Sequence, residues 1–212
     1  EVQTQLFSLA TGRLISDRTE TTSLADPLHL GTATIATVTD SSLFGATSPI
    51  AGRRSRFSLA PTAGSISFLG ATADYRRYFM PVEFYTIAGR LMHIGRYGSG
   101  GEDSRLLPLF IGYPELVRGY SIGSFSAGEC TATLTGSCAE FDRLLGSRML
   151  IGNIEFRFPI LRPFGVRSGM YGPVPIEVAL FADSGVAWNR GERPDFLGGD
   201  RQAATSAGAI AR

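Results

Sequence analysis

Long segments of alternating apolar and polar residues dominate the chain after residue 53. They cover 54–63, 66–79, 84–97, 148–158 and 176–188, another begins at 205, and 33–44 is rich in small and β-branched residues. Alternation with a period of two predicts strands that have one apolar face. A typical strand has about five or six residues, whereas a tilted strand that crosses a membrane needs about nine to eleven. The lengths therefore favour a transmembrane β-barrel.

Each alternating segment separates its side chains into two different sets. In 148–158 the even positions include Leu150, Ile154 and Phe156, and the odd positions include Asn153, Glu155 and Arg157. Aromatic residues collect at segment ends, where the chain has Phe44, Tyr78, Phe79, Phe84, Tyr85, Tyr97, Phe156, Phe158 and Trp188. Two aromatic girdles around an apolar band are typical of a membrane barrel. A water-exposed sheet can show the same alternation, so a soluble β-sandwich stays open at this point.

Composition excludes several other classes of protein. Apolar residues make up 43% of the 212-residue chain, which is enough for a folded core, and 26 glycines suit a β-rich body with many turns. The net charge of +1 predicts no nucleic-acid partner. The chain has arginine and no lysine, which is consistent with a codon bias and also suits fixed ion pairs. The sequence contains no run of eighteen apolar residues, so no transmembrane helix is predicted.

The first 26 residues lack the long alternating segments of the rest of the chain. One short strand is expected at 2–9, then a turn at Thr11-Gly12 and a polar tail. The segment LFSLATGRL resembles the outer strand and turn of a TolB-like propeller blade. We therefore expect 1–26 to be the end of a preceding periplasmic domain or a linker, and 27–212 to be a partial barrel. A start at Glu1, without a signal segment, suggests a fragment or a processed piece.

The segment 98–147 interrupts the strand pattern and is long for a connection inside a compact domain. It contains VRGY at 117–120, which places a guanidinium between apolar residues and a glycine. Cys130 and Cys138 also lie here, and in an oxidising compartment they favour a disulfide. Two thiols, far in sequence from His29 and His93, do not make a metal site. No cofactor is expected.

Three motifs carry a family resemblance. VRGY at 117–120, IEFRFP at 154–159 and FADSGVAW at 181–188 come in the order and spacing of the BamA/TamA-type outer-membrane assembly superfamily, the bacterial surface antigen barrel. The final TSAGAIAR resembles the strand that follows in that family. The resemblance covers about 33–212 and implies an all-β fold, an antiparallel transmembrane barrel that is partial and open as given, with a long loop folded inward.

The resemblance also implies a site and a role. In that family the loop arginine contacts acidic residues of the adjacent wall inside the lumen. By matching position the arginine is Arg118 and the acids are Glu155 and Asp183, with Gly119 allowing a sharp turn and Tyr120 packing on the wall. We name Val117, Arg118, Gly119, Tyr120, Glu155 and Asp183 the loop lock. The expected location is the bacterial outer membrane, and the expected partners are its lipid, unfolded outer-membrane clients and periplasmic accessory proteins.

Alternative functions remain open in the sequence. A passive outer-membrane pore or a structural surface barrel fits the same strands. The N-terminal polypeptide-binding repeats and the closing strands typical of the family do not occur in this chain. GYSIG at 119–123 matches the G-x-S-x-G pattern of hydrolases, but no strand precedes Ser121 and no helical period follows it. We therefore expect no enzymatic activity.

Overall fold

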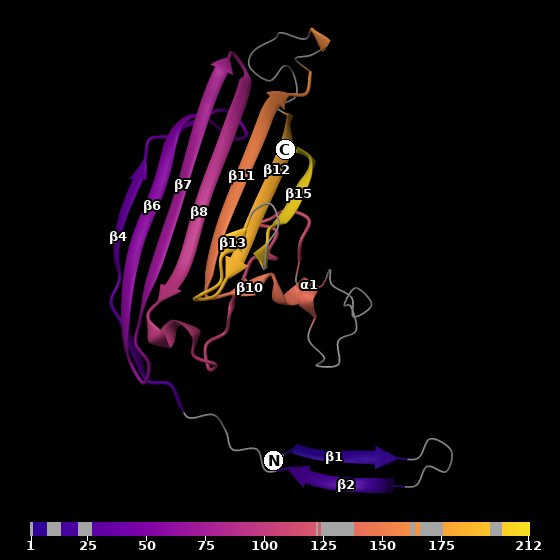
Figure 1. The fold of residues 1–212 in the computed structure, drawn as a ribbon. Helices are drawn as coiled ribbons and strands as arrows, with labels where there is room; N and C mark the ends of the chain where they lie inside the picture. Colours follow the sequence, from indigo (N-terminus) through magenta and orange to yellow (C-terminus); the bar gives the residue numbers. More distant parts are fainter. Residues whose placement is uncertain are drawn as a thin grey trace.

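The computed structural model confirms an all-β chain. It describes residues 27–121, 123, 138–161, 164–165, 176–195 and 201–212, together with the backbone of 2–7 and 14–20. Figure 1 shows one large curved sheet, with a small helix and several short strands near its lower end. No helix in the described part of the chain is long and apolar enough to cross a membrane.

One antiparallel sheet of nine strands forms the body. Its order is β15 (Ala204–Ala211), β12 (Glu177–Trp188), β11 (Arg148–Pro159), β8 (Tyr85–Tyr97), β7 (Phe68–Val82), β6 (Pro49–Gly64) and β3 (Leu30–Thr32), while β4 (Ile35–Asp40) and β5 (Leu43–Phe44) also pair with β6. The sheet is open, with β15 at one edge and β3 and β4 at the other. This arrangement agrees with the predicted partial barrel.

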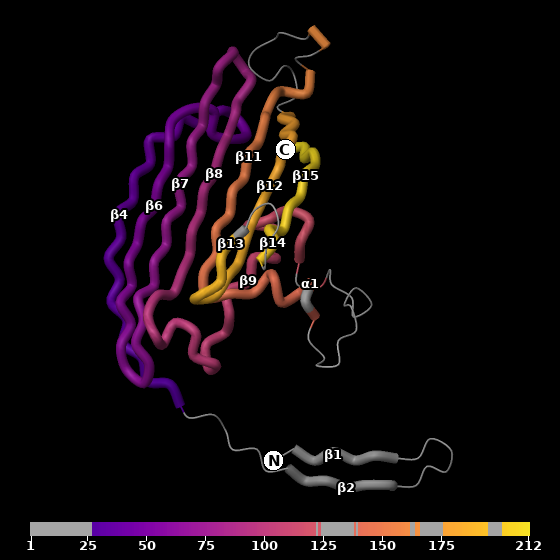
Figure 2. Tube along the Cα trace, viewed as in Figure 1, coloured from indigo at the N-terminus to yellow at the C-terminus, as the bar shows by residue number. Residues whose placement is uncertain are grey.

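Short elements complete the described chain. They are the hairpin of β1 (Val2–Phe7) and β2 (Leu14–Glu20), the 3-10 helix η1 (Ser99–Glu102), the pair β9 (Leu109–Phe110) and β10 (Leu145–Gly146), helix α1 (Ala139–Asp142), and the parallel pair β13 (Pro194–Asp195) and β14 (Arg201–Gln202). Figure 2 traces residues 98–121 from the lower end of β8 to the side of the sheet that carries β12 and β15. The described part of segment 98–147, called the long segment below, therefore lies beside β8, β11 and β12, which are called the wall strands.

Strand register divides the sheet into two faces. The row Arg76, Arg90, Asn153 and Asp183 runs across β7, β8, β11 and β12 on the inward face, which the long segment contacts. The neighbouring row Tyr75, Leu91, Gly152 and Ser184 lies on the outward face. Because side chains alternate along each strand, these two rows determine whether each remaining residue of the four strands faces inward or outward.

Burial on the two faces is the reverse of that in a soluble sheet. Large apolar side chains are exposed on the outward face, including Phe79 at 55%, Leu91 at 56% and Ile154 at 56%. Charged side chains are buried on the inward face, including Glu155 at 8% and Asp183 at 3%. An exposed apolar surface of this extent indicates contact with lipid or another apolar partner.

The hydrophobic core lies between the inward face and the long segment. Ile111 and Val117 from the long segment and Leu144 before β10 are fully buried, and they pack with Met149 and Ile151 of β11. Ala187 and Ala204 extend this cluster onto β12 and β15. The apolar inward residues of β11 therefore serve to seat the loop.

Several predicted boundaries were wrong. The polar tail after Thr11-Gly12 contains β2, which pairs with β1. The expected turn at 45–53 is shorter, because β6 begins at Pro49 and includes Gly52, whose φ of 95° bends the strand. The turn expected at Met80-Pro81 lies after Val82, because a register irregularity between Phe79 and Val82 accommodates the proline.

Candidate functional site

Arg118 holds the long segment against β12. Its Nε and Nη2 donate to the two carboxylate oxygens of Asp183 at 2.7 and 2.6 Å, and its backbone N–H donates to Oδ2 at 3.0 Å. The guanidinium carbon lies 3.8 Å from the centre of the Phe181 ring on the same strand. This two-pronged geometry fixes the orientation of the guanidinium in addition to pairing its charge.

Arg118 also reaches β11, where it donates through Nη1 to Glu155. Glu155 accepts further hydrogen bonds from Arg157 at 2.6 Å and from Arg212 at 3.0 and 3.2 Å. The structure therefore brings together Arg118, Glu155 and Asp183. The Asp183 side chain is fully buried, and among the described residues its only ion pair is with Arg118.

The other residues of the loop lock give the arginine its position. Val117 is fully buried in the core cluster. Gly119 has φ of 88°, a left-handed conformation that a side chain disfavours, so the backbone can turn directly after Arg118. Tyr120 packs against the core and donates a long 3.5 Å hydrogen bond to the Thr205 carbonyl of β15.

Two wall residues that sequence reasoning did not assign also hold the loop. Asn153 donates to the Leu116 carbonyl at 2.9 Å, and Arg90 donates to the Glu115 carbonyl at 3.0 Å. Arg90 is itself held by Asp74 through two hydrogen bonds of 3.0 and 3.1 Å. Their position on the polar face was the available signal, but their partners are backbone carbonyls, which no side-chain motif identifies.

A second long-range contact joins the two sides of the inward face. Ser48, in the connection between β5 and β6, donates to both oxygens of Glu177 on β12, at 2.8 and 3.1 Å. Arg157 donates to the Pro49 carbonyl at 3.2 Å. Ser48 and Glu177 are both buried. The curl at the start of β6 therefore reaches across the sheet to β11 and β12.

The base of the long segment is tied to the β12–β15 connection. Glu102 accepts from Ser147 Oγ at 2.6 Å and from the backbone N–H of Arg190, and Ser147 N–H donates to Asn189 at 2.9 Å. The hydrogen bond from Ser147 is the main cause that lowers the pKa of Glu102 below its ordinary value; burial opposes it and the Arg190 amide adds to it. Both connections are thus anchored at one end of the sheet.

The cysteine and metal predictions fall partly outside the described residues. Cys138 lies immediately before α1, and Cys130 is outside the described part of the chain, so their pairing stays a prediction. His93 faces outward, where its ring nitrogens contact the Met149 carbonyl at 2.9 Å and the Tyr97 hydroxyl at 2.6 Å. Within the described ranges, no group of three or more His, Cys, Asp and Glu residues could hold a metal ion.

Comparison with known families decides the identity of this arrangement. The model of the Omp85 superfamily domain matches residues 28–210, a range that reaches every strand of the main sheet and includes the whole loop lock. The chain belongs to the Omp85 superfamily. The predicted resemblance to BamA/TamA-type barrels is thereby confirmed at the level of the superfamily. No match was found among curated proteins.

Membership explains the reversed burial of the Omp85 domain. Proteins of this superfamily are bacterial outer-membrane proteins that act in assembly or translocation, so an exposed apolar face has lipid as its natural environment. The buried charges of the inward face then line the side away from lipid. The family assignment therefore accounts for the sheet, while the loop lock is the feature whose role needs a proposal.

Proposed function

We propose that this Omp85 domain lies in a bacterial outer membrane and acts in outer-membrane protein assembly, insertion or polypeptide translocation. The outward face would contact lipid. Aromatic groups support this placement at both ends of the strands. Tyr85 stacks with Phe156 at 5.9 Å near the short β7–β8 turn, and His93 lies 5.9 Å from Trp188 toward the opposite end. Such girdles mark the two membrane interfaces of a barrel.

The loop lock is the observation that carries the proposed role. Arg118 joins the long segment to two wall strands at once, so the segment cannot leave the inward face without breaking both ion pairs. We propose that this contact sets the conformation in which the domain handles a polypeptide client.

Polarity of the inward face supports a path for polypeptide rather than lipid. A cavity of about 260 Å³ lies between the long segment and the wall, lined by several arginines and by Glu115 and Glu155. Charges of both signs would keep the inner side wet. Unfolded outer-membrane proteins and periplasmic accessory proteins are the proposed partners, nucleic acid is not, and the proposed role requires no catalytic residue.

A reconstitution experiment tests this role. The full-length protein, with any accessory proteins it needs, is placed in vesicles, and the folding of an unfolded outer-membrane client is followed by its heat-modifiable migration. Arg118→Ala is expected to slow client folding strongly, whereas Arg56→Gln, an inward arginine of β6 outside the loop lock, is expected to leave it unchanged. Wild-type rates with Arg118→Ala would contradict the proposal.

A conductance measurement separates assembly from a passive pore. In planar bilayers the wild-type protein is expected to conduct little, and Arg118→Ala is expected to conduct more because the long segment leaves the inward face. A large, steady wild-type conductance, unchanged by that substitution and without client folding, would favour the passive pore.

A further inference from the structure

Two arginines stand on the face that otherwise carries apolar side chains. Arg53 of β6 and Arg77 of β7 are directly paired in the sheet, and Arg77 shares its face with Tyr75 and Phe79. In the main-sheet strands, the outward positions contain no carboxylate. Arg148 is the other outward arginine of these strands, and it stacks on Tyr97 at 4.8 Å. Arg53 and Arg77 therefore need a different explanation.

The pair lacks a protein counter-ion in the described part of the chain. Neither Arg53 nor Arg77 has a carboxylate within salt-bridge distance there, and both side chains are exposed. Like charges directly opposite each other in a sheet are destabilising, and arginine on a lipid-facing strand costs more the deeper it lies. An anion bound between the two guanidiniums would remove both penalties.

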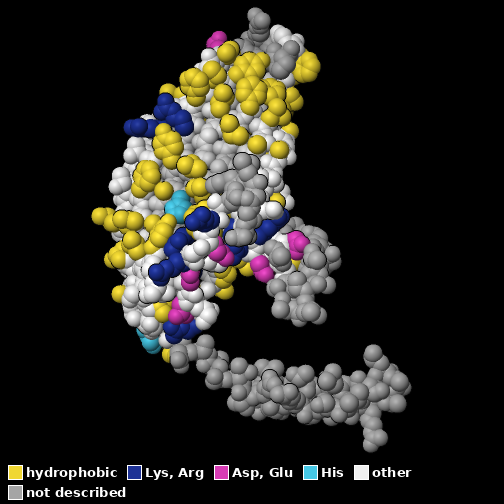
Figure 3. All heavy atoms as spheres, viewed as in Figure 1, with side chains coloured by type: hydrophobic (Ala, Val, Ile, Leu, Met, Phe, Trp, Pro, Cys, Tyr) yellow, Lys and Arg dark blue, Asp and Glu magenta, His cyan; other side chains and the backbone are white. Residues whose placement is uncertain are grey.

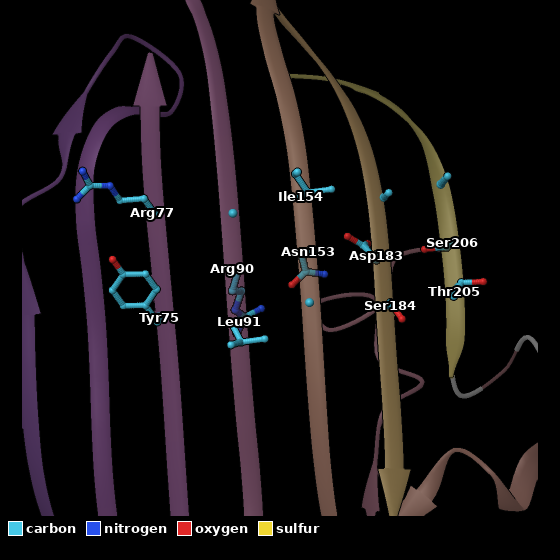
Figure 4. A pocket seen from close by; sticks show the side chains of 14 residues that line it. Tyr75, Arg77, Arg90, Leu91, Asn153, Ile154, Asp183, Ser184, Thr205 and Ser206 are labelled. Carbon is cyan, nitrogen blue, oxygen red and sulfur yellow. The ribbon is translucent and has the colours of Figure 1, made fainter. Parts of the chain in front are cut away.

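A groove begins beside this pair. It has a volume of about 890 Å³ and is bordered by Tyr75 and Arg77, and its floor includes Gly89, Gly152 and Ala182 of the next three strands. Figure 4 shows Arg77 at one side of the groove and Ile154 across from it. A Cβ built on Gly89 or on Gly152 would meet no atom within 4 Å, so the space over these glycines is open.

The groove follows the register of the sheet away from the arginine. Arg77 pairs with Gly89, Gly89 with Ile154, and Ile154 with Ala182. Glycine in the middle of a strand often marks the close approach of a ligand or of another backbone. A shallow, apolar channel with a cationic end has the chemical character of a site for an acyl chain joined to an anionic headgroup.

The position of the pair selects one leaflet. Arg77 lies toward the end of β7 that is joined to β8 by the short turn at Glu83 and Phe84, and the long segment leaves the other end of β8. The long segment is the longest connection of this sheet, and long loops are extracellular in bacterial barrels, so we assign the β7–β8 end of the strands to the periplasmic side. This assignment puts the start of β3 at the extracellular end, which does not agree with the periplasmic domain expected at 1–26. Figure 3 shows arginine side chains among hydrophobic ones near the upper ends of β6 and β7. A long arginine side chain there can reach the interface.

We propose that Arg53 and Arg77 bind the phosphate of an anionic glycerophospholipid of the periplasmic leaflet, with one acyl chain in the groove over Gly89 and Gly152. This inference rests on the proposed membrane placement of the outward face. It is independent of the loop lock, which uses the opposite face. Basic side chains at a membrane interface attract anionic headgroups.

Lipid titration of the delipidated full-length protein tests the site. Native mass spectrometry in a neutral detergent would count bound dioleoyl phosphatidylglycerol, with dioleoyl phosphatidylcholine and lipid A as competing probes. We expect retention of phosphatidylglycerol by the wild type and about tenfold weaker retention by Arg53→Gln/Arg77→Gln. The matched control Arg56→Gln lies on the same strand but on the inward face, and it is expected to match the wild type.

A second variant tests the groove separately from the charge. Gly89→Val/Gly152→Val fills open space and adds strand propensity, so it is expected to keep the fold while it weakens phosphatidylglycerol binding several-fold. Equal binding by the wild type and the double glutamine variant would overturn the proposal. So would equal binding of phosphatidylcholine, preference for lipid A, or no effect of the valines.

The two proposals fail in different ways. If the outward face does not contact a membrane, the wild-type protein will stay soluble without detergent and show no heat-modifiable migration. If only the lipid site is wrong, all variants will insert and the double glutamine variant will bind lipid like the wild type. Arg118→Ala should alter loop position and leave the phosphatidylglycerol titration unchanged.

Discussion

Removing Arg118 should release the long segment while the sheet survives. Asp183 is fully buried as a side chain and loses its ion pair, whereas Glu155 keeps Arg157 and Arg212. Breaking one side of a buried ion pair costs about 3 to 5 kcal/mol. Arg118 is 20% exposed as a side chain, so we take the lower end, about 3 kcal/mol. That value corresponds to about a hundredfold rise in the open fraction of the loop.

Proteolysis of the loop measures this change. When opening is fast, cleavage follows the population of the open form. A protease that cuts after aromatic residues can attack Phe110, Tyr113 and Tyr120, none of which the substitution alters. In the membrane-inserted full-length protein, Arg118→Ala should be cut about a hundred times faster than the wild type, while strand content by circular dichroism stays the same.

A double-mutant cycle identifies the partner. Asp183→Asn alone should also speed cleavage, and the double variant should be much less sensitive than the sum of the two single effects, because the interaction can be lost only once. Arg118→Lys should give an intermediate rate, since it keeps the charge and loses the two-pronged fork. Additive effects, or wild-type cleavage of Arg118→Ala, would refute the assigned contact.

Four further substitutions, one of them a control, test neighbouring parts of the structure. Gly119→Ala should weaken loop docking by about 1 to 2 kcal/mol because of its φ of 88°, measured as faster loop cleavage. Ile151→Ala should cost about 2 to 5 kcal/mol and release the loop, whereas Ile154→Ala, outward on the same strand, should leave cleavage unchanged. The pKa of Glu102 is lower in the folded protein than in the unfolded chain. The contribution of the Glu102 carboxylate to loop docking should therefore be complete above pH 4.5 and vanish as the pH falls through the lowered pKa. Ser147→Ala should flatten that pH dependence of loop cleavage, and an unchanged profile would argue against the hydrogen bond.

The sequence predicted the faces of the strands because a period of two leaves little freedom. Asp74, Glu155 and Asp183 were expected on the polar side, and the structure places them there. The pairing of Arg118 with two acids followed from a motif resemblance and not from periodicity. Alternation can place a side chain on a face, but it cannot say which loop folds over that face.

Contacts that depend on curvature were beyond the sequence pattern. Ser48 meets Glu177 only because the start of β6 curls across the inward face. Arg212 reaches Glu155 because β15 lies beside β12. Gly52 and Pro81 predict turns when only their residue types are considered. In the structure Gly52 lies within a bent part of β6, and Pro81 lies at a register irregularity of β7. The local sequence pattern therefore predicted the strands better than the contacts between residues far apart in the sequence.

The reversal of the two faces can be measured along a single strand. Spin labels at Ala71, Thr72 and Ala73 of β7, in the full-length protein inserted in vesicles, would be tested for collision with lipid-soluble oxygen and with a water-soluble nickel complex. Labels at 71 and 73 should favour oxygen, and the label at 72 should favour nickel. Equal nickel access at all three positions, or the opposite alternation, would contradict a sheet whose apolar face meets lipid and whose polar face holds the loop.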